Sequence, residues 1–338
     1  MGNTIGFDVG GRSVKGVLVD SDGAVLATTK QPTGFSTNLE SLADALRISM
    51  TELGQTRIAD GSLAKDSVAI PFGLGIAGSR TKEQLLRGSP NLPALCGHDV
   101  GAVVGAVLGR PAIVENDANC AATAEHWIGA AGGCPDFLMV ALGTGVGSGL
   151  FLGNQLFQGS TGRGCELGHT IVERGGRLCG CGNRGCLEAY ISETAVRARV
   201  RESTEQLESV VSVRARAQAQ SQSQGQGQGQ GQTDGWARAL FDLAAEGEPR
   251  AEALACEMVE VLGGAIACAV NLFDLPTVVL GGGLARGVLG RLDDLNRGLA
   301  SALFARRTGD VRIVGAALGP LAGAIGAARI AMPKRSPD

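Results

Sequence analysis

Two stretches of this sequence share one plan, in which an apolar strand, a glycine-rich turn and a second apolar strand follow one another. The first copy covers residues 5–20 and the second covers residues 138–152. Gly143 takes the place in the second copy that Gly10 takes in the first. The repeated unit predicts a duplicated architecture of two lobes, each opened by one copy, with the phosphates of a nucleotide between them. The alternative is two unrelated turns in a chain with 53 glycines.

Both turns have a chemistry that suits phosphate. Glycine-rich turns expose backbone N–H groups, which phosphate can approach closely. In the first copy Asp8 is suited to a hydrated Mg²⁺, and Arg12 and Lys15 are suited to phosphate; in the second copy Thr144 adds a hydroxyl donor. The pair Gly10–Gly11 favours a two-residue hairpin loop with positive φ. Neither turn is a Walker loop, because G-x-x-x-x-G-K-[ST] is absent, and an ordinary hairpin with a charged tip is the alternative for the first.

The segment 164–188 concentrates metal-binding chemistry. One histidine and three cysteines lie in it: His169, Cys179, Cys181 and Cys186. Three thiols and an imidazole can close a tetrahedral Cys₃His zinc site, and four protein ligands leave no open position, which predicts structural zinc. The glycines between the cysteines let the backbone fold tightly. Glu166 and Glu188 flank the ligands, so a zinc site would fix where both acids point. The alternative is a glycine-rich loop with free thiols.

Length and composition exclude several classes of protein. At 338 residues the chain exceeds a typical single domain, which agrees with two lobes. A net charge of −3 gives no basic surface for nucleic acid. Nine cysteines, an odd number, suit a reducing compartment better than a disulfide framework. The chain opens directly on a strand, and its apolar run at 313–328 is short for a membrane span, so we expect a cytoplasmic protein without a membrane partner.

The run A-I-V-E-N-D-A-N-C-A-A at 112–122 predicts a strand followed by a helix that begins in a polar cluster. Asn116 and Asp117 are good N-caps, and capping is one interpretation of the cluster. The functional interpretation is that Asp117, at the carboxyl end of a strand between the lobes, accepts a proton from a substrate hydroxyl. A pKa of about 3.9 makes it a weak base. That suffices for phosphoryl transfer, where positioning outweighs proton abstraction.

Two matches to G-x-G-x-x-G, at 73–78 and 180–185, do not predict a dinucleotide site. Such a site needs a long helix directly after the glycines and an acid about 20 residues further on. Arg80 and its neighbours follow the first match instead, and the run S-P-N-L-P at 89–93 interrupts the chain. Asn91, between two prolines, either binds a polar ligand or caps a rigid turn.

The rest of the chain alternates predicted helices and strands. Apolar periodicity predicts helices at 36–53, 251–271 and 318–332, and buried strands at 277–284 and 311–314. Gly282 and Gly283 close the strand at 277–284, where they either lie against a purine ring or form a tight turn. Residues 214–235 are rich in Gln and Gly and predict a disordered surface loop, with a functional tether as the alternative.

The chain resembles the ROK family (repressor, open reading frame, kinase) of bacterial sugar kinases over nearly its whole length except the Gln/Gly-rich segment. Six motifs carry the resemblance: D-V-G-G at Asp8, E-N-D-A-N at Glu115, L-G-T-G at Leu142, E-L-G-H at Glu166, C-G-C-G-N-R-G-C-L-E at Cys179 and L-G-G-G at Leu280. The resemblance implies an α/β, two-lobed actin/hexokinase-like (ribonuclease H-like) fold. The expected lobes are residues 1–117 plus 318–338, and residues 118–317.

The same resemblance implies ATP-dependent phosphorylation of a hexose, usually at the 6-hydroxyl, with Mg²⁺ and structural Zn²⁺ as cofactors. It makes Asp117 the catalytic base. The implied sugar ligands are Gly78, Asn91, Asn116, Asp117, Glu166, His169 and Glu188. The implied ATP-binding residues are Asp8, Gly10, Gly11, Arg12, Lys15, Thr144, Gly145, Gly282 and Gly283. The implied zinc ligands are His169, Cys179, Cys181 and Cys186. Family members also suggest a homodimer or a homotetramer.

Glucose is the expected sugar, because the P-N-L-P and C-L-E-A-Y contexts resemble glucokinases. N-acetylglucosamine, N-acetylmannosamine, mannose and fructose are the alternatives, since one contact difference changes specificity by only a few kcal/mol. A DNA-binding repressor of the family would carry a helix-turn-helix before the first strand, whereas this sequence begins at that strand, which argues against a repressor. A non-catalytic sugar-binding protein would lack the base or the phosphate loops, and this sequence has both. Arg12 replaces the Thr usual in the family, which predicts altered donor affinity or a different phosphate donor, because a guanidinium can bind phosphate bidentately.

Overall fold

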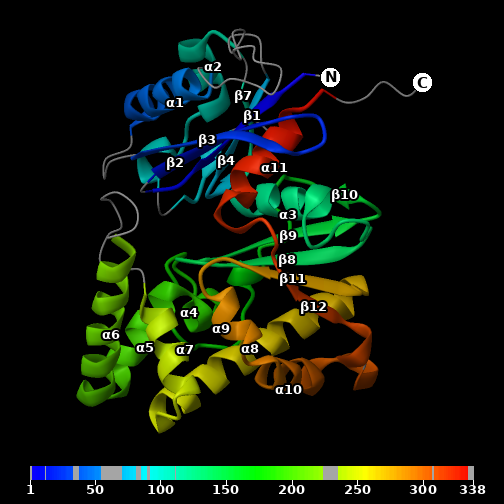
Figure 1. Ribbon diagram of the computed structural model, residues 1–338. Coiled ribbons are helices and arrows are strands. Elements are labelled where there is room, and N and C mark those ends of the chain that lie inside the picture. The colour runs from blue at the N-terminus through cyan, green and yellow to red at the C-terminus, as the bar shows by residue number, and fades with distance from the viewer. Residues whose placement is uncertain are drawn as a thin grey trace. The chain divides into compact units, whose positions relative to one another are not determined.

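The computed structural model describes residues 2–11, 13–32, 38–54, 71–80, 85–89, 92–110, 112–223, 235–306 and 308–333 (Figure 1). The chain divides into two compact units. The first, unit 1, consists of Met1–Met139, Gly149–Cys165 and Ala316–Asp338. The second, unit 2, consists of Val140–Ser148 and Glu166–Gly315.

The first of two five-stranded sheets has the strand order β3-β2-β1-β4-β7. Its strands are β1 (Thr4–Val9), β2 (Ser13–Val19), β3 (Val25–Pro32), β4 (Phe72–Ile76) and β7 (Ala112–Asn116). β1, β2 and β3 are antiparallel neighbours, whereas β1, β4 and β7 run parallel. The parallel arrangement brings the carboxyl ends of β1, β4 and β7 to one edge of the sheet, which is where ligands of such sheets usually bind.

The second sheet repeats this order as β10-β9-β8-β11-β12. Its strands are β8 (Phe137–Leu142), β9 (Val146–Leu152), β10 (Gln155–Leu156), β11 (Thr277–Gly281) and β12 (Arg312–Gly315). β10 runs antiparallel to β9, and β11 runs parallel to β12. Numbered within its own sheet, each sheet reads 3-2-1-4-5, so the duplicated architecture expected from the two glycine turns is confirmed.

The second glycine turn spans residues 143–145 between β8 and β9, and the first lies between β1 and β2. The two-residue loop expected for the first turn stays a prediction, because Arg12 lies outside the described residues. Val9 and Val14 are the last partners in the register, and the N–H of Gly10 donates to Ser13 O at 3.0 Å. Gly10 does not adopt a positive φ, so the positive φ expected at that position is wrong.

Four helices accompany the first sheet in unit 1. Their bounds are α1 (Leu39–Gly54), α2 (Val100–Leu108), α3 (Asp117–Ile128) and α11 (Ala322–Ala331). Unit 1 also has the short strands β5 (Ser79–Arg80) and β6 (Leu86–Arg87) and the 3₁₀ turns η1 (Pro93–Leu95) and η5 (Gly319–Leu321). α1 buries one apolar face, including Leu42 and Leu46, in a core that contains Phe7 and Phe72. Burial of such side chains stabilises the unit by about 1.5–3 kcal/mol each.

Small residues let α11 lie directly on the first sheet (Figure 1). A Cβ at Gly6 would come within 1.9 Å of Ala324 O, and one at Gly73 within 2.1 Å of Ala327 O. A Cβ at Gly326 would come within 1.7 Å of Cys120 O, so α11 also packs closely on α3. The glycine at 73 in the G-x-G-x-x-G match at 73–78 therefore has a packing role.

Unit 2 contains the remaining helices. Their bounds are α4 (Glu188–Ile191), α5 (Glu193–Ser203), α6 (Glu205–Ser223), α7 (Trp236–Ala245), α8 (Pro249–Phe273), α9 (Ala285–Leu289) and α10 (Leu292–Ala302). Three further 3₁₀ turns are η2 (Leu167–His169), η3 (Phe304–Arg306) and η4 (Thr308–Asp310). α8 is the one helix in the described ranges that is long and apolar enough to cross a membrane by length and composition. It packs along α10 and buries eleven residues of its face, as a core helix of a globular domain does.

Helix α6 contradicts part of the expected disordered loop, because residues 214–223 are helical. Leu207, Val211 and Ala215 are buried at a spacing of four residues, which continues one apolar face into the Gln-rich segment. Gln218 Nε2 donates to Asp242 Oδ2 on α7 at 2.8 Å. Residues 224–234 lie outside the described part of the chain.

Residues 118–139, 149–165 and 316–317 belong to unit 1, whereas the expected division placed them in the second lobe. α3 belongs to unit 1, although residues 118–128 were expected in the second lobe. The close contact between Gly326 and Cys120 explains the difference, because it joins α3 to α11. The C-terminal helix α11 lies in unit 1, and the boundaries of the two lobes stay a prediction.

Candidate functional site

The first glycine turn is flanked by an ion pair. Asp8 on β1 and Lys15 on β2 face each other in the register, and Lys15 Nζ lies 3.0 Å from Asp8 Oδ2. Lys15 Nζ also donates to Pro320 O at 3.3 Å. Both side chains are partly exposed, 32% for Lys15 and 20% for Asp8, so each can exchange its partner for Mg²⁺ or phosphate at low cost. Gly10 lies beside this pair, whereas Arg12 lies outside the described residues.

Asn116 and Asp117 lie where β7 meets α3. The side chain of Asn116 caps α3 by accepting hydrogen bonds from Ala118 N at 2.9 Å and Asn119 N at 3.1 Å. Its Nδ2 donates to Gly78 O at 3.0 Å, so the structure brings these two predicted sugar ligands together. Asp117 is the first residue of α3 and half-buried. The capping interpretation therefore describes Asn116. The Oδ1 of Asp117 also accepts from Ala118 N at 2.9 Å, and the role of Asp117 as a base stays a prediction.

Glu115 is a residue of this region to which the sequence assigned no role. Its side chain is buried, with Oε1 accepting from Asn116 N at 2.9 Å and from Asn119 Nδ2 at 3.0 Å. Gln158 donates to the other oxygen. A buried carboxylate satisfied by several donors fixes the backbone around it, here the backbone that presents Asp117. Asn91 lies outside the described residues.

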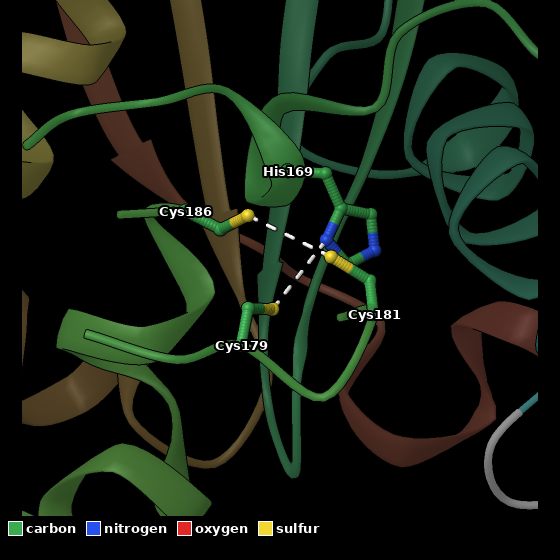
Figure 2. A group of neighbouring side chains, drawn as sticks. All are labelled: His169, Cys179, Cys181 and Cys186. Atoms are coloured by element: carbon green, nitrogen blue, oxygen red, sulfur yellow. Dashed lines mark hydrogen bonds between the residues drawn. The ribbon is translucent and has the colours of Figure 1, made fainter. Parts of the chain in front are cut away.

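The four predicted zinc ligands converge in unit 2 (Figure 2). His169 ends the 3₁₀ turn η2, and the three cysteines come from the loop before α4. All four ligand atoms lie within 4.8 Å of one another, with Cys179 Sγ 3.8 Å from His169 Nδ1 and Cys181 Sγ 3.7 Å from Cys186 Sγ. Tetrahedral zinc with Zn–S of about 2.3 Å requires separations of about 3.5–3.8 Å. The donor set and its spacing fit a zinc ion.

The pKa values of the three thiols shift in different directions. Burial raises the pKa of Cys179 to about 12 and also raises the pKa of Cys186. The pKa of Cys181 is lowered: burial opposes the shift, but the Asn183 backbone and the other two thiols stabilise its thiolate by hydrogen bonds. A metal ion would replace the remaining protons, which explains how three thiols can be packed so closely.

Contacts within the chain also support the loop that carries the cysteines. The hydroxyl of Tyr190 accepts a hydrogen bond from Arg177 N at 2.9 Å and donates to Glu173. Arg177 in turn pairs with Glu202 of α5. Val172 N donates to Gly185 O at 2.8 Å. These bonds reach the loop between its metal ligands, so its shape does not depend on one ion alone.

Glu188 joins the cysteine cluster to the second glycine turn. Its Oε2 accepts from Val146 N at 3.0 Å, and its Oε1 lies 3.5 Å from Cys179 Sγ, which donates to it. A Cβ at Gly145 would come within 2.3 Å of Glu188 Oε2, so a side chain at this position would displace the Glu188 carboxylate. The structure thus brings the predicted sugar ligand Glu188 against the predicted phosphate residue Gly145.

Glu166 precedes η2 on the same side of the cluster. The residue is exposed overall, yet partial burial of its carboxyl raises its pKa. The charge of His169 opposes this shift, and the negative charge of Glu188 adds to it. The shift therefore places Glu166, His169 and Glu188 in one electrostatic neighbourhood, as expected for side chains that share a ligand.

Gly282 and Gly283 follow β11 and behave differently. Gly282 has φ +86°, and a Cβ there would lie 2.2 Å from Leu142 O, so it packs against the end of β8. A Cβ at Gly283 would meet no heavy atom within 4 Å. Of the two interpretations given to this pair, the tight turn describes Gly282, whereas Gly283 has open space beside it.

Comparison with known proteins assigns the chain to a family. Residues 4–334 match the sequence profile of the ROK family. The chain belongs to the ROK family. This match confirms the resemblance that the six motifs carry, and it extends the resemblance over the segments between them.

Glucokinases are among the ROK proteins most similar to this one. A glucokinase of Thermotoga maritima is 30% identical over 328 residues, which cover 96% of this chain and 96% of that protein. A glucokinase of Streptomyces coelicolor is 32% identical over 345 residues, which cover 100% of this chain and 99% of that protein. An N-acetylmannosamine kinase of Escherichia coli O157:H7 and a xylose repressor of Bacillus subtilis each match at 28% identity over shorter stretches.

The fold agrees with a solved ROK structure. A ROK family glucokinase from Streptomyces griseus in complex with glucose and AMPPNP superposes with a TM-score of 0.73 at 30% identity. The superposition covers 98% of this chain and 99% of that one. The two mixed sheets and their helices are thus the actin-like fold expected for a ROK protein, and the chain is a sugar kinase of this family.

Proposed function

We propose that this ROK kinase transfers the γ-phosphoryl group of ATP to the 6-hydroxyl of a hexose, with glucose as the preferred sugar. The observation that supports this proposal best is the end-to-end similarity to glucokinases, one of which was solved with glucose and AMPPNP. The motifs that carry phosphate chemistry and the acid-bearing run at β7–α3 are all present in this chain.

Asp117 is the proposed catalytic base. Its place at the start of α3 is fixed by the Asn116 cap and by the buried carboxylate of Glu115. A carboxylate at this point can accept the proton of a sugar hydroxyl as phosphoryl transfer proceeds through a loose transition state. We expect the following residues to bind sugar hydroxyls: Gly78, Asn91, Asn116, Glu166, His169 and Glu188.

The proposed nucleotide ligands divide into charges and backbone groups. Asp8 would hold hydrated Mg²⁺, because a carboxylate is a ligand that Mg²⁺ prefers. Lys15, with Gly10, Gly11 and Arg12, would bind phosphate oxygens beside it. Thr144 and Gly145 would bind phosphate through the second turn. Gly283 would lie against the adenosine, with Gly282 shaping the turn.

The cysteine cluster fits a structural zinc ion. His169, Cys179, Cys181 and Cys186 would supply all four ligands, and a closed tetrahedral site leaves no position for substrate. The ion would supply rigidity and positive charge rather than reaction chemistry. The chain's own contribution is Glu188, whose carboxylate is oriented by Val146 N.

N-acetylmannosamine is the second candidate sugar, and the observation that favours it is the 28% identity to an N-acetylmannosamine kinase of Escherichia coli O157:H7 over 85% of both chains. N-acetylglucosamine, mannose and fructose remain alternatives on chemical grounds, since these hexoses share most hydroxyl positions. A non-catalytic sugar-binding regulator is the remote alternative.

The test is a substrate panel with a coupled ADP readout. Purified protein with Mg²⁺-ATP is expected to release ADP with glucose at the highest kcat/KM, and less with the other four sugars. Phosphorylated product is checked at the 6-position by NMR. A higher kcat/KM for N-acetylmannosamine would replace glucose, and sugar-independent ADP release alone would overturn the kinase assignment for this site.

The donor is tested in the same assay. Arg12→Thr restores the residue usual in the family, and we expect it to change the kinetics with ATP relative to polyphosphate. Unchanged kinetics with both donors would remove Arg12 from donor selection. The cytoplasmic location and the homodimer or homotetramer remain predictions, and light scattering of the purified chain measures the second.

A further inference from the structure

Helix α5 binds carbonyl groups of the second glycine turn. The backbone N–H of Glu193, the first residue of α5, donates to Gly143 O at 2.9 Å. The hydroxyl of Thr194, the next residue, donates to Thr144 O at 2.9 Å. Two consecutive carbonyl groups of the turn therefore point towards α5.

The direction of these carbonyl groups determines where the N–H groups of the turn point. In a planar trans peptide the C=O and the following N–H point in opposite directions. No cis peptide occurs among the described residues. Because the carbonyl groups of Gly143 and Thr144 face α5, the N–H groups of Thr144 and Gly145 point away from it.

The other N–H groups of the turn are occupied. Gly143 N donates to Gly145 O at 2.9 Å, and Val146 N donates to Glu188 Oε2 at 3.0 Å. Within the described ranges, the N–H groups of Thr144 and Gly145 donate to no protein acceptor. Successive N–H groups that point the same way form a concavity that binds anions. The turn therefore presents two open donors on one side.

We propose that Glu193 and Thr194 are positioning residues for the phosphate groups of the nucleotide. They fix the two peptide planes whose N–H groups bind phosphate, without touching the nucleotide. The inference rests on the proposed function, because it takes the bound anion to be the phosphate chain of ATP or ADP. Loss of one such hydrogen bond should weaken nucleotide affinity about threefold to tenfold.

The carboxylate of Glu193 has a different partner from its backbone. Its Oε1 accepts from Trp236 N at 2.9 Å and from Gly235 N at 3.3 Å, which caps α7. The backbone N–H that binds Gly143 and the side chain that caps α7 can therefore be removed separately. Two variants of Glu193 can therefore measure what this one N–H group contributes to nucleotide binding.

Thr194→Val removes one hydroxyl from an exposed side chain and keeps its shape. We expect the KM for ATP and the Kd for ADP, measured by calorimetry, to rise about threefold to tenfold. The KM for the sugar and the melting temperature should stay as in the wild type. Thr194→Ser retains the hydroxyl and should restore nucleotide affinity.

Glu193→Pro removes the N–H donor. Glu193 is the first helical residue, where proline is well tolerated, and Ser192 before it has the extended backbone (φ −105°, ψ 166°) that a following proline requires. Glu193→Ala is the matched control, because it removes the same carboxylate and keeps the N–H. We expect Glu193→Pro to weaken ADP binding about threefold to tenfold relative to Glu193→Ala.

Unchanged ADP binding in Thr194→Val, or equal ADP binding in Glu193→Pro and Glu193→Ala, overturns the proposal. So does an equal rise in KM for sugar and nucleotide, which indicates general distortion. A wild-type chain that binds ADP but phosphorylates no hexose refutes the proposed function while these binding measurements still decide the inference. A wild-type chain that binds neither ADP nor ATP overturns both.

Discussion

The two glycine turns occupy the same place in sheets of the same topology, yet their surroundings differ. The β1–β2 turn is flanked by charged side chains, with Lys15 paired to Asp8. The β8–β9 turn consists of uncharged residues, and its carbonyl groups are bound by α5 while Val146 N is bound by Glu188. If both turns bind phosphate as proposed, the same backbone plan serves two means of binding, by exposed charges in one case and by fixed peptide dipoles in the other.

The difference extends to the acids near each turn. Glu188 is held at both oxygens by neighbouring groups of unit 2. Asp8 instead shares a single, partly exposed ion pair with a lysine. Fixed groups cost no reorganisation when the ligand arrives, whereas an exposed ion pair can change partners during a catalytic cycle. We expect mutations in unit 1 to change the catalytic rate or the charge at the nucleotide. Mutations in unit 2 should instead change the geometry of the bound groups.

The comparison fails most clearly if unit 1, which contains both the β1–β2 turn and Asp117, carries no catalytic group. Asp117→Ala should lower kcat about 10³-fold or more, because it removes the proposed base. Sugar affinity should change little, since the other proposed ligands remain. Sugar binding by calorimetry beside the coupled ADP assay separates the two effects, and a variant that keeps most of its kcat removes Asp117 from the role of base.

Loss of a cluster ligand should have the next largest effect. Cys181→Ser is expected to weaken zinc binding about 100-fold or more, because one of four ligands is lost. Zinc per chain, measured with a chromogenic chelator after denaturation, should fall from about one towards zero, and sugar affinity should fall with it. Cys268→Ser, at an exposed thiol outside the cluster, is the control. Equal zinc content in both variants would contradict the site.

Variants of Gly282 and Gly283 test the claim that unit 2 acts through geometry. Gly282→Ala should lower the free energy of unfolding by about 2–4 kcal/mol, because its Cβ meets Leu142 O at 2.2 Å and its φ is +86°. Gly283→Ala should leave stability within about 0.5 kcal/mol and weaken ATP binding. Urea unfolding and nucleotide calorimetry test the two, and equal stability losses would refute the distinction.

The smallest expected effect concerns the charge at the first turn. Lys15→Met should raise the KM for ATP about tenfold, while stability changes by less than about 1 kcal/mol because the ion pair is partly exposed. Arg47→Met removes a comparable exposed pair with Asp44 in unit 1 and should leave the KM unchanged. Equal kinetics in the two variants would show that Lys15 does not bind phosphate.

The sequence predicted those features that depend on residues close together in the chain. The duplicated sheets followed from the repeated turns, and the cysteine cluster followed from three thiols within eight residues of one another. The position of α3 after β7 followed from the polar run that begins it. In each case neighbouring residues determine the outcome, through strand alternation, metal coordination or helix capping.

Contacts between distant segments were not predictable in the same way. Thr194 meets Thr144 across 50 positions, and Gln158 meets Glu115 across 43. No spacing rule relates such residues, because the packing of whole elements brings them together. The extension of α6 into the Gln-rich segment was missed because composition outweighed the buried positions Leu207, Val211 and Ala215, whose periodicity was visible in the sequence.

Tyr190 is the only tyrosine of the chain, and its hydroxyl is bonded inside the loop that carries the cysteines. A protein labelled selectively on tyrosine would therefore give a single ring signal in an NMR spectrum, reporting on that loop alone. Burial and the Glu173 hydrogen bond raise the pKa of this phenol, so its titration would also respond if the loop opened. The molecule thus contains its own spectroscopic label in the loop that carries the cysteine cluster.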